Sequence, residues 1–225
     1  MAIEADLIRK WQHGWSLARG LPEPEVGADG ISVRCDQPGR EVEVVALHAD
    51  EDPASVTRLA AVVAASAAVT WLTVPTNRPD EVERLILDSG LKLLKRSEAL
   101  MTVDLARHPV HRPADSYRAE IRSNESVIQA SLYDSADEVA AYGQMGIAGT
   151  HAVADRIETL PAHRRRGLGR AVMSLLAEAA LAHGAKTGLL IASEEGQHLY
   201  AALGWNRVAD VLIAAAPVDP DPGAS

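Results

Sequence analysis

The stretch at residues 157–171 reads IETLPAHRRRGLGRA and changes character twice along its length. Its first part is typical of a strand that ends near Pro161, and its last part begins an apolar helix near Leu168. The turn between them is basic and contains the glycines Gly167 and Gly169. Glycines let a backbone approach a ligand closely, and the free N–H groups at a helix start favour anions. The pattern predicts a cradle for a pyrophosphate group.

Arginines make the same turn strongly basic, and their guanidinium groups suit a polyphosphate. They are Arg164, Arg165, Arg166 and Arg170. A solvated basic helix start beside an acidic surface would also explain the arginines, but it would not explain the glycines. The turn has neither the GxxxxGK[ST] pattern of a Walker-type loop nor the GxGxxG pattern of a dinucleotide fold. Those two nucleotide-binding classes are therefore disfavoured.

Runs of strand and helix character surround this turn in a definite order. Strand-like runs at residues 117–121, 127–133, 139–147 and 153–160 indicate an antiparallel meander. A helix at 168–183, a strand at 188–192, a helix at 194–203 and a strand at 208–214 follow it. Earlier in the chain, helices are expected at 7–18, 53–65 and 79–88, and strands at 31–35, 42–47, 69–74 and, singly or as a pair, within 91–103. The sequence thus predicts an α/β protein.

The turn matches the pattern [QR]xxGx[GA] at Arg164, Gly167 and Gly169, and its surroundings resemble the GNAT superfamily of N-acetyltransferases. That family places a central strand, the loop, a long helix, a splayed strand and a short helix with a tyrosine in this order. The short helix here contains Tyr200 and ends in Leu-Gly-Trp at residues 203–205. The likeness covers about residues 139–214. It implies an α/β (α+β) fold with a mixed, mostly antiparallel central sheet flanked by helices, duplicated as two halves.

The resemblance implies that acetyl-coenzyme A (acetyl-CoA) is the cosubstrate, that it lies between the two splayed strands, and that no metal is involved. It assigns cofactor binding to Ile157, Glu158, Thr159, Arg164, Arg165, Arg166, Gly167, Leu168, Gly169, Arg170 and Ser193. Ser193 stands where the family usually has asparagine. Its hydroxyl could instead cap the helix that follows, so its contact with the ligand is left open.

The implied reaction transfers an acetyl group from a thioester to a primary amine of a small molecule or a protein. Tyr200 corresponds to the family's tyrosine that protonates the leaving thiolate, although a buried core aromatic would fit the same position. Asp155 and Glu158 are candidates for the base, or for binding a charged substrate. They are three residues apart, so in a regular strand they face opposite sides. The resemblance implies that Asp155 faces the acceptor pocket and that Glu158 lies nearer the acetyl group, at a point where the family's strand bulges. Structural ion pairs with nearby arginines are the alternative role for both.

The proline-containing segment 106–115, ARHPVHRPAD, predicts a domain boundary. We expect a degenerate GNAT-like or acceptor-side domain at 1–107, a linker at 108–115, a catalytic domain at 116–217 and a disordered tail at 218–225. His108 and His111 are expected to be solvated linker residues.

The first half echoes the second, which favours a tandem form, but its turn HADEDPAS at 48–55 is acidic and lacks glycine. We therefore expect no acyl-CoA site there. The second half enters its strands directly after the linker, without the helices that cover one side in the family. The first half is thus expected to supply one wall of the acceptor pocket. Trp11, Trp15 and Trp71 could contribute, although buried tryptophans are the commoner explanation.

Composition limits the remaining possibilities. The chain has 225 residues and a formal net charge of −9, which disfavours nucleic-acid and acidic-membrane binders because both need a basic field. Its lone cysteine, Cys35, can form no internal disulfide and favours a reducing compartment. Charged residues at positions 4, 6, 9 and 10 stand where a secretion signal would need an unbroken apolar stretch, so we expect no export. The longest apolar run, at residues 59–72, is shorter than a membrane span requires. We expect a cytoplasmic acyltransferase that is a monomer or homodimer, with a non-catalytic acyl-CoA sensor as the alternative.

Overall fold

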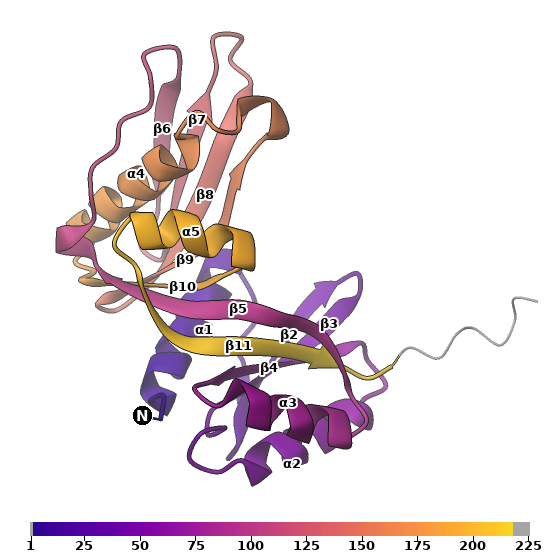
Figure 1. Cartoon of the computed structure of the whole chain (residues 1–225). Coiled ribbons are helices and arrows are strands. Elements are labelled where there is room, and N and C mark those ends of the chain that lie inside the picture. The colour runs from indigo at the N-terminus through magenta and orange to yellow at the C-terminus, as the bar shows by residue number, and fades with distance from the viewer. Residues whose placement is uncertain (1, 218–225) are drawn as a thin grey trace, which may run out of the picture. The chain divides into compact units, whose positions relative to one another are not determined.

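The computed structural model describes residues 2–217, and these divide into two compact units (Figure 1). Unit 1 contains residues 2–8, 22–98 and 209–217, and unit 2 contains residues 9–21 and 99–208. The expected disordered tail at 218–225 lies outside the described residues. No helix within residues 2–217 is long and apolar enough to cross a membrane.

This division differs from the expected boundary at residues 107 and 108. Residues 9–21 belong to the unit built from the C-terminal strands, and residues 209–217 belong to the other unit. The segment expected as a linker packs within unit 2, where the N–H of His111 donates to Ser174 Oγ at 3.0 Å. The Ser174 hydroxyl lies 2.9 Å from the Pro109 carbonyl oxygen and donates to it. The prolines exclude regular structure from this segment but do not prevent it from docking on a helix.

His108 also differs from expectation, because it is buried and not solvated. Its ring meets the ring of Trp205 edge-on, with centroids 6.4 Å apart. Burial lowers the pKa of His108, because the charged imidazolium loses its hydration. The residue therefore serves as a neutral packing group.

Unit 1 is a sheet in the order β1-β2-β3-β4-β11. Its strands are β1 (Glu25–Val26), β2 (Gly30–Gln37), β3 (Arg40–Ala46), β4 (Thr70–Thr76) and β11 (Asn206–Ala215). β3 and β4 are parallel, and the other neighbours are antiparallel. Two helices, α2 (Ala54–Ala64) and α3 (Pro79–Asp88), lie side by side against this sheet (Figure 1). Their apolar faces pack on Val44, Leu72 and Val74, which forms the core of the unit.

Unit 2 is a sheet in the order β5-β10-β9-β8-β7-β6. Its strands are β5 (Lys92–Asp104), β6 (Arg118–Ser123), β7 (Val127–Tyr133), β8 (Val139–Ala148), β9 (His151–Thr159) and β10 (Thr187–Ala192), and β5 enters it with residues 99–104. Short 3₁₀ turns lie at Leu105–Arg107 and Pro161–His163. β9 and β10 are parallel, and the other pairs are antiparallel. The expected mixed, mostly antiparallel sheet is confirmed, with one long strand in the 91–103 region.

Helix α4 (Leu168–Ala182) covers one face of this sheet and packs on β7, β8 and β9 (Figure 1). Its inward face carries Val172, Met173 and Leu176, which join Ile128 and Met145 in the core. Because apolar residues recur at helical spacing in this segment, the sequence places α4 correctly. Helix α5 (Glu194–Ala202) packs beside β10.

Helix α1 (Ala5–Arg19) covers the opposite face of β8 and β9 with the residues that belong to unit 2. Glycines make this approach close: a Cβ added to Gly146 on β8 would lie 2.0 Å from the Gly14 carbonyl oxygen. A Cβ on Gly14 would lie 2.3 Å from Val153 Cγ2 on β9. The helix on this side comes from the first half of the chain, since residues 118–159 contain strands and no helix of their own.

We predict that Gly146→Ala destabilises the protein, because the added methyl group must push α1 away from β8. Overpacking of this kind costs about 1–3 kcal/mol. In a chain of this size the melting temperature should fall by roughly 2–4 °C for each kcal/mol lost. Thermal unfolding checks this, with Gly27→Ala as the control because a Cβ there meets only Gly30 O at an ordinary 3.5 Å. Equal melting temperatures for the two variants would contradict the close contact.

Candidate functional site

Strands β9 and β10 separate partway along their length. They pair at His151–Thr187, Ala152–Gly188 and Val153–Leu189, whereas both strands continue, to Thr159 and to Ala192. β9 keeps its pairing with β8 on its other side. Within the described residues, the β10-facing edge of residues 154–159 has no strand partner. Its backbone groups are therefore available to a ligand that lies along β9.

A bulge in β9 corrects the expected orientation of the two acidic residues. Tyr142 pairs with Glu158, and Gln144 pairs with Asp155, so Arg156 and Ile157 of β9 lie opposite the single residue Gly143 of β8. Arg156 carries the distortion, with a positive φ of 53°. Because the bulge changes the side-chain alternation, Asp155 and Glu158 face the same side of the sheet. The opposite orientation holds only for a regular strand, and β9 has instead the bulge that the family resemblance implies near Glu158.

The turn between β9 and α4 exposes a run of backbone N–H groups. Gly167 is the N-cap of α4 with φ of 78°, a left-handed conformation that favours glycine, and Arg165 also has a positive φ of 64°. In the described part of the chain, the N–H groups of residues 165–170 donate to no backbone carbonyl. They converge at the positive end of the helix dipole, which favours an anion.

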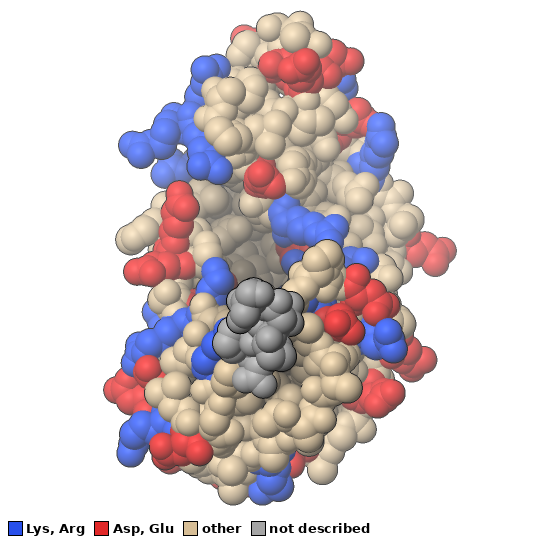
Figure 2. Space-filling model, turned by 90° about the vertical axis from the view of Figure 1, so that its right-hand side faces the viewer, with Lys and Arg blue, Asp and Glu red and all other residues tan. Residues whose placement is uncertain are grey.

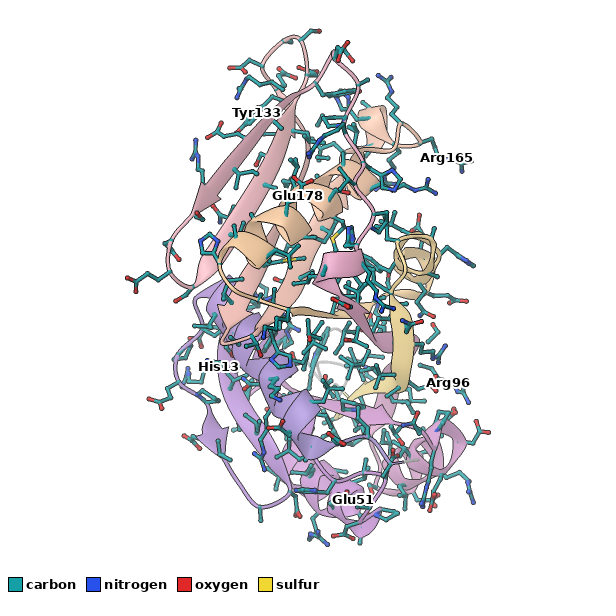
Figure 3. All side chains as sticks on the ribbon, turned by 90° about the vertical axis from the view of Figure 1, so that its left-hand side faces the viewer. His13, Glu51, Arg96, Tyr133, Arg165 and Glu178 are labelled. Carbon is teal, nitrogen blue, oxygen red and sulfur yellow. The ribbon has the colours of Figure 1, made fainter. Side chains whose placement is uncertain are left out.

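Basic side chains surround these N–H groups. The Arg164 guanidinium turns back and donates to the Thr159 carbonyl oxygen at 3.2 Å, which ties the turn to the end of β9. The side chain of Arg165 projects outward from the turn (Figure 3). Figure 2 shows Lys and Arg side chains gathered in one region at the upper left of that view, although the chain carries a net charge of −9. A local basic field on an acidic protein suits a polyphosphate ligand.

Gly169 lies in the first turn of α4, where space is limited. A Cβ added there would lie 3.3 Å from Leu199 Cδ2 on α5 and 3.7 Å from Thr159 Oγ1 on β9. The surface at this point is formed by β9, α4 and α5 together. The free N–H groups, the arginines and this close approach fit the pyrophosphate of a coenzyme A thioester.

Side chains from helix α1 and from strand β8 hold Asp155 in place. Arg19 of α1 donates to it twice, from Nε at 2.9 Å and from Nη2 at 2.8 Å. Gln144 Nε2 lies 3.4 Å from the same carboxylate and donates to the Ala18 carbonyl oxygen at 2.7 Å. The Arg19 guanidinium also lies 5.0 Å from the centre of the Trp15 ring. A bidentate pair of this kind positions a carboxylate but occupies the oxygens that a base would use.

Glu158 lies in a different environment on the same face. It is exposed and accepts a hydrogen bond from the Tyr142 hydroxyl. That bond is the main reason that the pKa of Tyr142 is raised. Glu158 is therefore more accessible to a solvent-borne substrate than Asp155 is.

Tyr200 is buried on α5, with its ring centroid 5.9 Å from that of Trp205. Burial raises the pKa of its hydroxyl to about 12, and the negative charge of Asp155 adds to the effect. The phenol therefore holds its proton throughout the physiological pH range. Ser193 caps this helix by accepting from the Gly196 N–H at 3.2 Å, which is the alternative role the sequence left open.

The corresponding turn of unit 1, between β3 and α2, has a different chemistry. Asp50 is buried there and accepts from the backbone N–H of Ile3 at 3.0 Å and from that of Asn77 at 3.0 Å. The Thr76 hydroxyl donates to the same carboxylate at 2.5 Å. The donors at this end of β4 are thus satisfied by a carboxylate of the chain itself.

Residues 97–205 match the model of the acetyltransferase (GNAT) family. No curated protein sequence matches the chain. Within residues 2–217, no group of three or more His, Cys, Asp or Glu residues is placed to hold a metal ion.

Solved structures resemble the chain over most of its length. A GCN5-related N-acetyltransferase from Kribbella flavida is 17% identical with a TM-score of 0.71, and the match covers 97% of each chain. A tandem GNAT protein from the clavulanic acid biosynthesis pathway is 14% identical with a TM-score of 0.58, covering 87% of this chain and 82% of that one. A GCN5-related N-acetyltransferase from Sphaerobacter thermophilus is 9% identical with a TM-score of 0.58, covering 83% and 76%. At these identities the likeness shows the fold.

The segment that matches this family model brings together most of the residues that the sequence singled out. The turn residues 164–170 lie beside the open edge of β9, while Asp155, Glu158 and Tyr142 share one face of the sheet. Sequence reasoning missed Arg19, which is 136 residues away from Asp155 along the chain. No local pattern signals that pair. Tyr142 could have been found by counting back along the β8–β9 hairpin from its turn at Gly149, provided that the bulge was allowed for.

We predict that Arg19→Met destabilises the protein, because it removes the bidentate partner of the largely buried Asp155 carboxylate and leaves the longer ion pair with Arg156 Nε at 3.8 Å. The side chains of Arg19 and Asp155 are only 16% and 10% exposed. The free energy of unfolding should fall by roughly 2–3 kcal/mol. Chemical denaturation checks this against Arg34→Met, whose partner Asp36 is 65% exposed and whose pair should contribute almost nothing. A loss no larger than that of the control would show that Arg19 does not anchor Asp155.

Proposed function

We propose that the protein is an acetyl-CoA dependent N-acetyltransferase that acts on a primary amine of a small molecule or a peptide. The observation that carries this proposal is the parting of β9 from β10 beside a turn whose N–H groups have no backbone partner. A thioester cofactor needs both features, since its pyrophosphate requires the turn and its long arm requires an open strand edge.

The binding roles follow from the placement of the residues. The N–H groups of Arg165, Arg166, Gly167, Leu168, Gly169 and Arg170 would hold the pyrophosphate, with the turn's arginines as counter-charges. The backbone of Ile157, Glu158 and Thr159 would pair with the pantetheine arm along the open edge of β9. Contact between Ser193 and the ligand stays a prediction, because its hydroxyl already accepts from Gly196.

Tyr200 is the proposed donor to the leaving sulfur. Bound acetyl-CoA would supply a thioester acetyl group there. A phenol whose pKa is about 12 is a poor acid for complete proton transfer to a thiolate, whose own pKa is about 8.5. It remains a hydrogen-bond donor at every physiological pH, which stabilises negative charge as that charge develops. The structure therefore favours a hydrogen-bonding role for Tyr200 within the proposed reaction.

Glu158 is the better candidate for accepting the amine proton. Asp155 has both oxygens engaged by Arg19, whereas Glu158 is exposed and its neighbour is the neutral Tyr142 hydroxyl. A water molecule could relay the proton between the amine and this carboxylate. We assign Asp155 the role of holding α1 against β9, with an electrostatic effect on Tyr200.

One observation keeps a second function open. Both candidate carboxylates accept hydrogen bonds from neighbouring side chains, an arrangement that also suits a non-catalytic acyl-CoA sensor. Both functions require cofactor binding, but only the enzyme releases thiol. A panel of small amines, antibiotics and peptides assayed for coenzyme A release separates them, and it also identifies the acceptor. A cytoplasmic location and a monomeric or homodimeric state are part of the same proposal.

We predict that Gly169→Val sharply weakens acetyl-CoA binding, because a branched side chain would crowd the space against Leu199 and Thr159 that the phosphates approach. Calorimetric titration should show at least a tenfold rise in the dissociation constant, a loss of about 1.4 kcal/mol. The melting temperature confirms that the variant is folded. Unchanged affinity in a folded variant would rule out the cradle. The same titration should give one cofactor per chain, since the turn of unit 1 is acidic, and two would contradict that assignment.

We predict that Tyr200→Phe lowers turnover by roughly 10²- to 10³-fold, as expected for loss of one hydrogen-bond donor to developing negative charge, while cofactor affinity stays nearly unchanged. The substitution removes one hydroxyl and keeps the ring that packs against Trp205. Because the pKa of Tyr200 is raised to about 12, the ratio of wild-type to variant rates should be flat between roughly pH 7 and pH 9.

Tyr133→Phe is the matched control for this test, because Tyr133 lies on β7 with its ring beneath Arg118. Its turnover should equal that of the wild type. A fall of less than about threefold for Tyr200→Phe would assign Tyr200 to the core alone.

A further inference from the structure

Tyr117 makes contacts that reach the basic turn from a distant part of the chain. Its hydroxyl accepts a hydrogen bond from Arg166 Nη1 at 3.1 Å. The same hydroxyl lies 3.2 Å from Nδ1 of His163, and the two rings meet edge-on with centroids 5.8 Å apart. The Tyr117 ring is half-buried against the core of unit 2. A core-anchored phenol therefore contacts two residues of one short segment.

The protons in this group can be assigned consistently. Arg166 can only donate, so the Tyr117 oxygen accepts from it and directs its own proton toward His163 Nδ1. That assignment places the imidazole proton on Nε2, and this nitrogen lies 3.6 Å from the Asp134 carboxylate. In this series of contacts, from Arg166 through Tyr117 and His163 to Asp134, each donor thus faces an acceptor. Such a directional group holds its members in one arrangement.

Arg166 is the residue whose freedom this arrangement limits. A free arginine side chain carries about 2 kcal/mol of rotamer entropy, which it loses when it binds an anion. The hydrogen bond to Tyr117 uses one guanidinium N–H of Arg166 and leaves others for a phosphate. A guanidinium that is held in advance loses less entropy on binding. Arg166 also precedes Gly167, so the same contact steadies the left-handed residue that caps α4.

We propose that Tyr117 is a positioning residue for the anion-binding turn, and that its hydroxyl holds Arg166 ready for the phosphates of coenzyme A. This inference rests on the proposed function. Tyr117 lies 49 positions away from Arg166 in the sequence. It is therefore outside the [QR]xxGx[GA] pattern that identifies the turn.

The test is a double-variant cycle measured by titrating coenzyme A into the full chain. Tyr117→Phe keeps the ring and removes the hydroxyl, and it should raise the dissociation constant roughly three- to tenfold. In an Arg166→Ala background the same change should have little further effect, because the hydroxyl acts through Arg166. Titration of 3′-dephospho-coenzyme A shows whether Arg166 serves the pyrophosphate or the 3′-phosphate. The effect of Tyr117→Phe should also shrink at high salt, since it acts on a charge contact.

Tyr133→Phe is the control, because it removes a hydroxyl from a tyrosine that packs on Arg118 instead. Its affinity should match that of the wild type. Melting temperatures of all variants should lie close together. If Tyr117→Phe weakens binding equally with and without Arg166, or leaves affinity unchanged, the positioning role is overturned while the proposed function stands. If the wild type does not bind coenzyme A, the proposed function fails and this inference fails with it.

Discussion

The separation of β9 from β10 is the constraint on which the arrangement of the site depends. The two strands share three residue pairs and then continue without a shared ladder in the described structure. Backbone groups that leave a ladder must find other partners or remain available to a ligand. The bulge at Arg156 belongs to the same region, because it bends β9 while β8 stays paired with it. The position of the basic turn between β9 and α4 therefore depends on the path of β9.

The basic turn between β9 and α4 and the acidic turn between β3 and α2 each connect a strand to a helix, but they carry opposite charge. In unit 2, glycine and left-handed backbone leave N–H groups free at the start of α4, and arginines add positive charge. In unit 1, the turn before α2 lacks glycine, and Asp50 accepts from Ile3, Thr76 and Asn77. The N–H groups of Glu51, Asp52 and Ser55 in and after this turn donate to backbone carbonyls nearby, so they are not available to an external anion. Both connections run from a strand through a turn to a helix, but the residue that caps the helix is left-handed Gly167 in unit 2 and right-handed Pro53 in unit 1.

Helix α1 shows that the residues around a site can come from far along the chain. Gly14 and Gly146 let two backbones meet, and Arg19 then reaches Asp155 from the end of the same helix. This pairing leaves Glu158 as the accessible carboxylate on its face. The assignment of roles to the two acids therefore depends on packing between a helix and a sheet. The identity and spacing of the two acids along β9 would allow either of them to be the proton acceptor or the structural ion-pair partner.

The sequence alone determined the order of strands and helices in unit 2, the position of the basic turn and the likeness to the GNAT family. These features are local: apolar periodicity, glycine at a left-handed position and clustered arginines all act within one or two turns of chain. The residue pattern of β9 does not show the bulge that turns Asp155 toward the side of Glu158, because one inserted residue leaves no mark on that pattern; only the family resemblance indicated a bulge near Glu158.

Tertiary structure alone decided that residues 9–21 join the C-terminal strands and that residues 209–217 join the N-terminal ones. It also decided that Arg19 binds Asp155 and that Tyr117 holds Arg166. These contacts join segments between 49 and 136 residues apart. Their partners are selected by which surfaces can pack closely without burying unpaired charge, a property of the folded chain as a whole.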